Sequence, residues 1–249
     1  MTESPAGPPA GSSLAGPAGG EPYAGSFAAG PVGSEPLAAG READVFALDD
    51  RRVLRRYRHA VDVAGEAAVM AYVARFGYPV PAVFEARGTD LVMERLDGPT
   101  MAQALVAGDL GLHDGAATLA DLLRRLHELP VWAGAAPGTS VVHLDLHPEN
   151  VMLTGRGPIV IDWRNATAAQ ADLDTAFSAL IIAQVAIGSI DHPLTPAAGA
   201  FLDAFLPLAP GDPTRLLDDA VAARSRQSTL SPSEIGMLAA AAARVRGDR

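Results

Sequence analysis

Two short stretches of this chain decide its fold and chemistry: His143-Leu144-Asp145-Leu146-His147-Pro148-Glu149-Asn150 and Ile161-Asp162-Trp163. Asp145 offers a carboxylate that can accept the proton of an attacking hydroxyl. Asn150 and Asp162 each offer an oxygen of the hard type that Mg²⁺ prefers. Singly, such residues are more often caps or turn residues, so their fixed spacing carries the interpretation. Together they are the groups that phosphoryl transfer from a metal-bound nucleotide requires.

Apolar runs on both sides of these residues predict short strands. Residues 140–144 indicate an extended segment that leads into a tight loop, and residues 150–154 and 157–161 predict two strands. Gly155 and Gly157 lie in the turn between those strands. A hairpin of this kind holds Asn150 and Asp162 near one another.

The two stretches resemble the signature of a known family. The spacing H-x-D-x-x-x-x-N followed by I-D-W is similar to that of the kinase-like phosphotransferases related to aminoglycoside phosphotransferases and choline kinases, over roughly residues 40–179. The resemblance implies an α+β, protein-kinase-like fold of two lobes, with a small antiparallel sheet and one helix in the first lobe and a mainly helical second lobe. It also implies ATP and Mg²⁺, Asp145 as the catalytic base, and Asn150 and Asp162 as metal ligands.

The family has a phosphate-binding lysine on its third strand, and this chain departs from that pattern. Residues 52–57 contain no lysine, and Arg55 is the best match, with Arg56 as the alternative if the register slips by one. A guanidinium also binds phosphate and carboxylate, so the change is compatible with nucleotide binding. Glu66 is the expected partner of Arg55. The alternatives are an exposed basic strand edge for Arg55 and a favourable helix-dipole charge for Glu66.

Two further segments take their expected roles from the same resemblance. Residues 93–98 resemble the linker between the lobes, so Glu94 is expected to offer its C=O and Leu96 its N–H to the adenine edge. The segment that begins at Gly40 occupies the place of the phosphate-covering loop. It has one glycine where protein kinases have several, so by itself it is weak support for phosphate binding.

His143, His147, Asp172 and Asp174 have alternative interpretations. The two histidines raise the question of zinc, but Asp145 between them would point elsewhere, and a structural His143 that braces the loop is favoured. Asp174 resembles the family's acidic residue that holds the catalytic loop from below. A simple helix N-cap role for Asp172 or Asp174 competes with that assignment.

Patterning along the chain predicts three regions. Residues 1–36 are expected to be a disordered leader, because the first forty residues hold nine glycines and seven prolines and no Lys or Arg. Residues 37–97 are expected to form the sheet lobe, with a hairpin over 43–57, a helix over 63–76 and strands over 80–86 and 90–94. Residues 98–249 are expected to form the helical lobe, with helices over 101–106, 116–129, 173–187, 197–206, 213–226 and 232–246.

Composition narrows the classes of function. The chain has 249 residues, 49% of them hydrophobic, and a net charge of −10, which argues against nucleic acid as a partner. There is no cysteine, and hence no disulfide or thiolate chemistry. No apolar run is long enough to cross a membrane and no signal segment is recognisable, so a cytoplasmic protein is expected.

The expected activity is transfer of the γ-phosphoryl group of ATP to a hydroxyl of a small molecule. The resemblance fades in the helices that build the acceptor pocket, so it leaves the acceptor, the choice of ATP or GTP, and the oligomeric state open. The missing lysine and the single-glycine loop also keep a second hypothesis open, in which the chain is a nucleotide-binding pseudokinase or partner-binding module without turnover.

Overall fold

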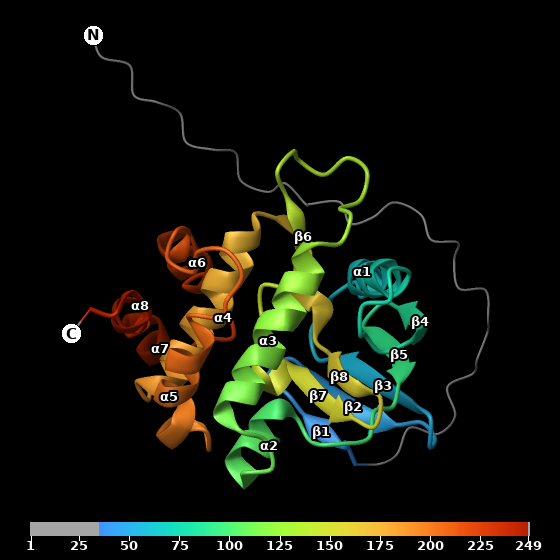
Figure 1. Cartoon of the computed structure of the whole chain (residues 1–249). Helices are drawn as coiled ribbons and strands as arrows, with labels where there is room; N and C mark the ends of the chain where they lie inside the picture. The colour runs from blue at the N-terminus through green and yellow to red at the C-terminus, as the bar shows by residue number, and fades with distance from the viewer. Residues whose placement is uncertain (1–34, 249) are drawn as a thin grey trace.

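The computed structural model describes residues 35–248, so all but the end of the predicted leader lies outside the described residues. Figure 1 shows a small sheet with one helix on one side of the molecule and a group of helices on the other. The chain is therefore α+β, with strands concentrated in its first part and helices in its second.

The small sheet has five strands, all antiparallel, in the order β1-β2-β3-β5-β4. Its strands are β1 (Ala38–Ala39), β2 (Ala43–Ala47), β3 (Arg52–Tyr57), β4 (Val83–Arg87) and β5 (Asp90–Glu94). The predicted hairpin is confirmed, and its turn is held by Asp49, whose side chain accepts hydrogen bonds from the amides of Arg51 and Arg52. The central strand β3 pairs with β2 and β5, which places Arg55 opposite Val45 and Leu91.

Helix α1 (Ala64–Ala74) follows β3 and packs near β4. Val69, Met70 and Val73 are buried, as their helical spacing predicts. Glu66 is buried with them, in the first turn of the helix. A carboxylate at such a position requires partners, and it finds them at the site described below.

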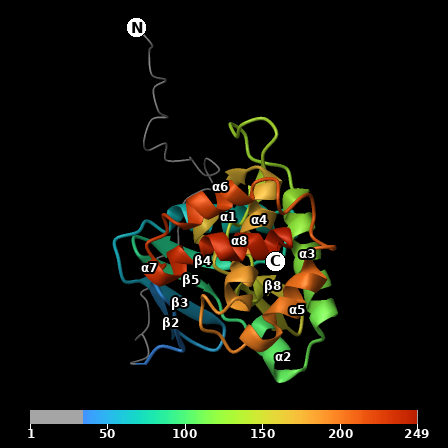
Figure 2. The ribbon, with the colours of Figure 1, turned by 90° about the vertical axis from the view of Figure 1, so that its left-hand side faces the viewer.

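The second part is mainly helical. Its helices are α2 (Met101–Ala107), α3 (Leu112–His127), α4 (Ala171–Ala186), α5 (Thr195–Phe205), α6 (Leu217–Arg224), α7 (Pro232–Gly236) and α8 (Leu238–Arg246). Helix α4 is central, because it contacts α3, α5, α6 and α8 and its residues from Asp174 to Gln184 are all buried. Figure 2 shows α8 lying across this group of helices. No helix among the described residues combines the length and apolarity that a membrane crossing requires.

Three predicted helices differ from those observed, and one of them, predicted over 116–129, begins earlier, at Leu112. The helix predicted over 232–246 is divided at Met237, which follows Gly236, a residue that costs about 1 kcal/mol in a helix interior relative to alanine. The helix predicted over 213–226 begins only at Leu217, because Asp212 accepts a hydrogen bond from the amide of Thr214 and holds a turn there.

Short strands connect the two parts. Strand β6 (Ser140–Val142) pairs with β9 (Thr167–Ala169), and β7 (Val151–Thr154) forms the predicted hairpin with β8 (Gly157–Val160). The segment after β5 lies on β7, where the amide of Leu153 donates to the carbonyl of Pro99 at 2.8 Å. Gly98 has a φ of +133°, and a Cβ there would lie 2.0 Å from the Leu153 carbonyl oxygen, so only glycine fits. The hairpin therefore lies against the linker, between sheet and helices.

Candidate active site

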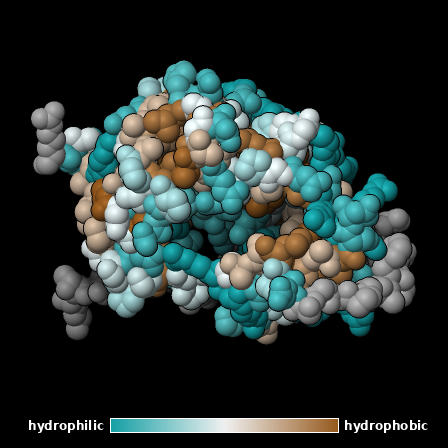
Figure 3. Space-filling view, turned by 90° about the horizontal axis from the view of Figure 1, so that it is seen from below, coloured by the Kyte–Doolittle hydropathy of each residue, from teal (hydrophilic) through white to brown (hydrophobic). Residues whose placement is uncertain are grey.

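A cavity of about 1090 Å³ lies between the sheet and the helices. Figure 3, which views the molecule from below relative to Figure 1, shows a hollow that is bordered by hydrophilic residues and has hydrophobic patches near it. Most of the residues predicted to form the site line the cavity: Arg55, Glu94, Leu96, Asp145, Asn150 and Asp162. The seventh, Glu66, does not line it and is connected to it through Arg55.

The loop that carries Asp145 is held from below by Asp174 of α4. Asp174 is fully buried. Its Oδ1 accepts a hydrogen bond from the amide of Leu144 at 2.7 Å, and its Oδ2 accepts one from the amide of His143 at 3.0 Å. The same Oδ2 also contacts His127 Nε2 at 2.9 Å. Burial alone would raise the pKa of Asp174, but these hydrogen bonds outweigh it and lower the pKa below its ordinary value. The residue is therefore a loop anchor, and the N-cap of α4 is Gln170 instead.

The same loop contains a strained residue. Leu144 has a φ of +59°, a left-handed conformation that costs a non-glycine residue about 1–2 kcal/mol. The two hydrogen bonds from the loop amides to Asp174 hold the backbone in this shape. Strain of this kind persists only where the surroundings impose it, and here it aims the next side chain, Asp145, into the cavity.

His143 braces the loop on its other side. Its ring is buried, its Nε2 lies 3.1 Å from the carbonyl oxygen of Ile161, and it packs edge-on against Trp163 with ring centroids 4.9 Å apart. Burial lowers the pKa of His143, which favours the neutral ring with Nε2 as donor to that carbonyl. The histidine thus ties the Asp145 loop to the segment after β8 that carries Asp162.

Asp145 has different neighbours at its two oxygens. Its Oδ2 accepts a hydrogen bond from Asn150 Nδ2 at 3.3 Å, and its backbone carbonyl accepts another at 2.9 Å. Its Oδ1 lies 3.9 Å from His147 Nε2 and 3.9 Å from Arg224 Nη1. Burial, and then the nearby charge of Asp162, raise the pKa of Asp145 to about 6.

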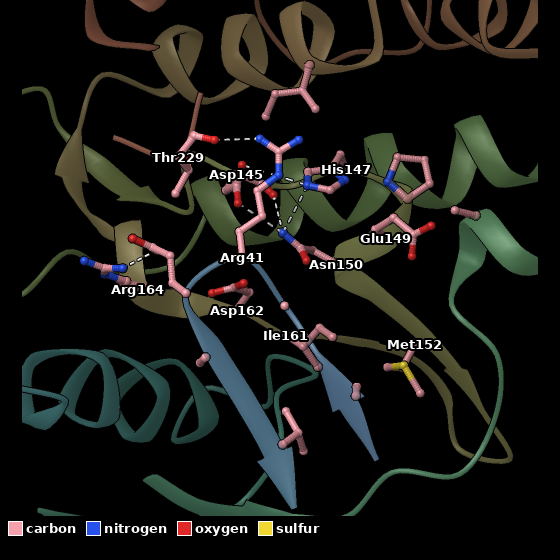
Figure 4. Close-up of a pocket in the computed structure, with 18 of the residues that line it drawn as sticks. Arg41, Asp145, His147, Glu149, Asn150, Met152, Ile161, Asp162, Arg164 and Thr229 are labelled. Atoms are coloured by element: carbon pink, nitrogen blue, oxygen red, sulfur yellow. Dashed lines mark hydrogen bonds and ion pairs between the residues drawn. The ribbon is translucent and has the colours of Figure 1, made fainter. Parts of the chain in front are cut away.

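Asn150 and Asp162 lie on the same side of the cavity, as Figure 4 shows. The hairpin register accounts for this, because Val151 pairs with Val160 and the amide of Ile161 donates to the carbonyl of Asn150 at 3.0 Å. Asp162 has a φ of +65°, which turns it out of the strand line. The amide nitrogen of Asn150 is used by Asp145, so its Oδ1 and the Asp162 carboxylate remain as oxygen donors. This donor set fits Mg²⁺.

Arg55 connects the sheet to these residues. Its Nη1 pairs with Glu66 Oε1 at 3.0 Å and its Nη2 with Asp162 Oδ1 at 2.6 Å, and only 11% of its side chain is exposed. Glu66 also accepts a hydrogen bond from the Tyr57 hydroxyl at 2.7 Å. Burial would lower the pKa of Arg55, but Asp162 and Glu66 outweigh it and raise the pKa, whereas burial raises the pKa of Glu66 despite the ion pair.

These contacts decide between the alternatives left open by the sequence. Arg55 is not an exposed strand edge and Glu66 is not a surface dipole charge, because the two form a buried ion pair. Arg56, the alternative register, points to the other side and pairs with Asp90 at the surface. The contact between Arg55 and Asp162 is an addition that the sequence did not predict.

Residues 34–140 and 131–215 match the sequence profile described as the Phosphotransferase enzyme family. The chain belongs to that family. This confirms the resemblance carried by residues 143–150 and 161–163. No curated protein matches the chain by sequence.

Solved structures show the same fold at low sequence identity. The gentamicin–APH(2'')-IIa complex has a TM-score of 0.56 at 11% identity and covers 87% of this chain and 93% of that chain. A thermostable mutant of aminoglycoside phosphotransferase APH(4)-Ia, in ternary complex with AMP-PNP and hygromycin B, has a TM-score of 0.55 at 15% identity, with coverages of 87% and 93%. Amicoumacin kinase hAmiN in complex with AMP-PNP, Ca²⁺ and Ami has a TM-score of 0.50 at 15% identity, with coverages of 86% and 87%. The predicted protein-kinase-like, two-lobed fold is thereby confirmed.

Within this family fold, the linker places Glu94 and Leu96 at the sheet side of the cavity. The side chain of Glu94 is directed to other partners, since Oε1 pairs with Arg156 at 2.6 Å and Oε2 accepts from the amide of Ala82 at 3.2 Å. The amide of Glu94 donates to the Ala82 carbonyl at 2.8 Å, so its backbone carbonyl is the group left for the role expected from the family. Adenine recognition by Glu94 and Leu96 stays a prediction.

Sequence reasoning assigned no role to the other arginines that line the cavity, among them Arg41 and Arg224. Arg41 extends from the loop between β1 and β2 across to the helical part, where it donates to the Thr229 carbonyl at 2.8 Å (Figure 4). It also pairs with Glu234 at 2.9 Å. Arg224, at the end of α6, is 6% exposed and lines the cavity. Its only sequence signal was a cationic last helical turn, which fits a helix dipole equally well.

Proposed function

We propose that this phosphotransferase uses ATP and Mg²⁺ to phosphorylate a hydroxyl group of a small molecule. The observation that supports this most is the convergence of Asp145, Asn150 and Asp162 on one cavity, beneath the loop of the sheet lobe. Family membership and fold already support a phosphotransferase that acts on a small molecule. The nucleotide, the metal and the roles of the residues are our proposal.

Asp145 is proposed to orient and deprotonate the acceptor hydroxyl. The hydroxyl oxygen attacks the γ-phosphorus, the bond from that phosphorus to the β,γ-bridging oxygen breaks, ADP leaves, and the proton goes to the Asp145 carboxylate. Asn150 supports the base, since its side chain holds both the carboxylate and the backbone carbonyl of Asp145. Most of the rate enhancement in such sites comes from positioning and from compensation of charge.

Asn150 and Asp162 are proposed to hold the metal through their side-chain oxygens. When bound, Mg²⁺ neutralises charge on the phosphate oxygens. Arg55 is proposed to contact the upstream phosphates while Glu66 keeps it in place. Glu94 and Leu96 are proposed to bind the adenine edge through their backbone groups.

The decisive experiment compares Asp145→Asn with the unchanged chain. Thermal shift with ATP and Mg²⁺ should be retained in the variant, whereas ADP release with an accepted hydroxyl compound should fall by about 10²- to 10⁴-fold. Asp109→Asn, an exposed position outside the cavity, is the matched control and should leave both readouts unchanged. Unchanged ADP release in Asp145→Asn would remove the base assignment.

A second candidate function, a nucleotide-binding pseudokinase, is favoured by one observation. Arg55 pairs with Asp162 at 2.6 Å, so one oxygen of the proposed metal ligand already has a partner. Under this alternative, ATP and Mg²⁺ shift the melting temperature but no acceptor releases ADP. Asp162→Ala separates metal-dependent binding from nonspecific binding, because it should abolish the Mg²⁺-dependent part of the shift.

A further inference from the structure

Arg224 is a buried cation whose charge is poorly matched by the protein. Its Nε contacts Gln184 Oε1 of α4 and its Nη1 donates to Gln227 Oε1 at 3.0 Å, so the guanidinium is fixed in place by two neutral amides. The carboxylate that approaches it most closely among the described residues is Asp145, at 3.9 Å, which is beyond hydrogen-bond length. Its Nη2 makes no hydrogen bond within residues 35–248, while burial lowers the pKa of the group.

Three other arginines that line the cavity have carboxylate partners, whereas the half-buried Arg95 donates to the backbone carbonyl of Asp49. Arg55 bridges two carboxylates, Arg164 contacts Glu42, and Arg41 pairs with Glu234. Arg224 differs in that its hydrogen-bond partners are amides and its nearest carboxylate, Asp145, lies 3.9 Å away. A buried charge that is only partly compensated is expensive, so its presence in a ligand cavity points to a ligand that supplies further negative charge.

The place of Arg224 relative to Asp145 indicates which ligand this is. Asn150, a proposed metal ligand, holds Oδ2 of Asp145, whereas Arg224 lies at Oδ1. Arg224 also comes from the helical part, which supplies an apolar wall to the cavity through Ile181, Ile182 and Val185 of α4. Residues of the sheet and of the β7–β8 hairpin form the proposed nucleotide side of the site. Arg224 therefore faces the acceptor side of Asp145.

Most acidic side chains that line the cavity are already engaged; Asp97, exposed on the linker, is the exception among the described residues. Besides Asp145, Glu149 lines the cavity on the acceptor side, and its oxygens contact His192 Nε2 at 2.8 Å and the Thr100 hydroxyl at 3.0 Å. A second cation, Arg226, lies two residues beyond Arg224 and also lines the cavity. A polyammonium acceptor needs free carboxylates, and this surface offers a buried guanidinium instead.

We propose that Arg224 binds an anionic group on the hydroxyl acceptor, so that the substrate is a small hydroxylated carboxylate or phosphate monoester with an apolar portion. This inference rests on the proposed function for the identity of the reacting hydroxyl. The anionic group lies against Nη2 of Arg224, the apolar portion against α4, and the hydroxyl at Asp145. Because a guanidinium is a planar donor fork, it suits a carboxylate or phosphate held close to the reacting group.

The test uses matched acceptors with and without the charge. Hydroxy acids, their primary amides, alcohol monophosphates, and the polycations kanamycin and gentamicin are each assayed for ADP release. Their binding to the protein with AMP-PNP and Mg²⁺ is measured in parallel by calorimetry. The unchanged protein should favour an acid or a monophosphate over the amide by about 10- to 100-fold, the range that a charge-assisted hydrogen bond gives.

Arg224→Gln should abolish that preference by raising the KM for the anionic acceptor, with the KM for ATP unchanged. Arg224→Lys, which keeps the charge, should restore part of the preference. Arg75→Gln, at an exposed position outside the cavity, is the control and should leave the preference unchanged. The melting temperature of Arg224→Gln is measured in parallel, so that a loss of folding is told apart from a loss of anion binding.

Three outcomes overturn the inference. The first is that no acid or monophosphate binds more tightly than its neutral counterpart. The second is that the polycations are preferred. The third is that kcat falls equally for every acceptor in Arg224→Gln, which would assign Arg224 to the transferring phosphoryl group. Failure of the proposed function looks different. In that case ADP is released with none of the acceptors, but calorimetry still detects binding of the anion to the unchanged protein and no binding to Arg224→Gln.

Discussion

Replacing Asp174 by asparagine tests whether a carboxylate under the loop is what shapes the site. Asp174 Oδ2 accepts from the His143 amide and contacts His127 Nε2, and Oδ1 accepts from the Leu144 amide. Asparagine keeps one oxygen, so its NH₂ group faces one of these donors. The variant loses a charge-assisted hydrogen bond of about 1.5–3 kcal/mol and leaves a buried N–H unsatisfied at about 1–3 kcal/mol. We expect a total loss of about 3–5 kcal/mol.

Urea unfolding of Asp174→Asn measures this loss as a change in the free energy of unfolding. Asp172→Asn is the matched control on the same helix, because Asp172 accepts from the Asp212 amide at 3.2 Å and contacts an exposed Arg215. That contact is worth about 1 kcal/mol or less. Equal losses in the two variants would refute the reasoning. So would a stable Asp174→Asn protein with unchanged turnover, because the strained loop that aims Asp145 would then not depend on the carboxylate.

Two other substitutions test the linker and the buried histidine. Gly98→Ala should lower the free energy of unfolding by more than Gly108→Ala, since a Cβ at Gly98 meets the Leu153 carbonyl oxygen at 2.0 Å and one at Gly108 meets nothing within 4 Å; equal urea midpoints would contradict this. His143 is buried with a lowered pKa, so below pH 6.5 the unfolded chain binds a proton there that the folded chain does not. Stability should therefore fall as pH drops below about 6.5, by up to about 1.4 kcal/mol per pH unit, and His143→Gln should reduce that slope. An unchanged slope in urea unfolding at pH 5 to 7 would exclude this histidine as its source.

The core of the site could be predicted because its residues are close in sequence. Asn150 and Asp162 stand at the two ends of one hairpin, and the register of β7 and β8 brings them together. Arg55 lies in strand β3 and Glu66 in the first turn of α1, the next element along the chain. Local alternation and helical spacing fix such neighbours, so spacing in the sequence carries over into distance in the structure.

The acceptor side could not be predicted in the same way. Arg224 reaches Asp145 from the end of α6, and Arg41 reaches Glu234 from the other end of the chain. Periodicity predicts that a segment is helical and which face is apolar, but it does not say which helix end meets which loop. The cationic last turn of α6 is also what a helix dipole favours, whereas the structure directs it into the cavity.

The arginine in place of the family lysine changes how the site is held together. A lysine has one terminal nitrogen, whereas the two terminal nitrogens of Arg55 reach separate carboxylates, Glu66 and Asp162. A single guanidinium therefore joins Glu66 of α1 to Asp162, which lies just after β8. An Arg55→Lys change keeps the charge but cannot reproduce both contacts at these distances. The absent lysine by itself is therefore poor support for an inactive protein, because the residue in its place meets the expected glutamate.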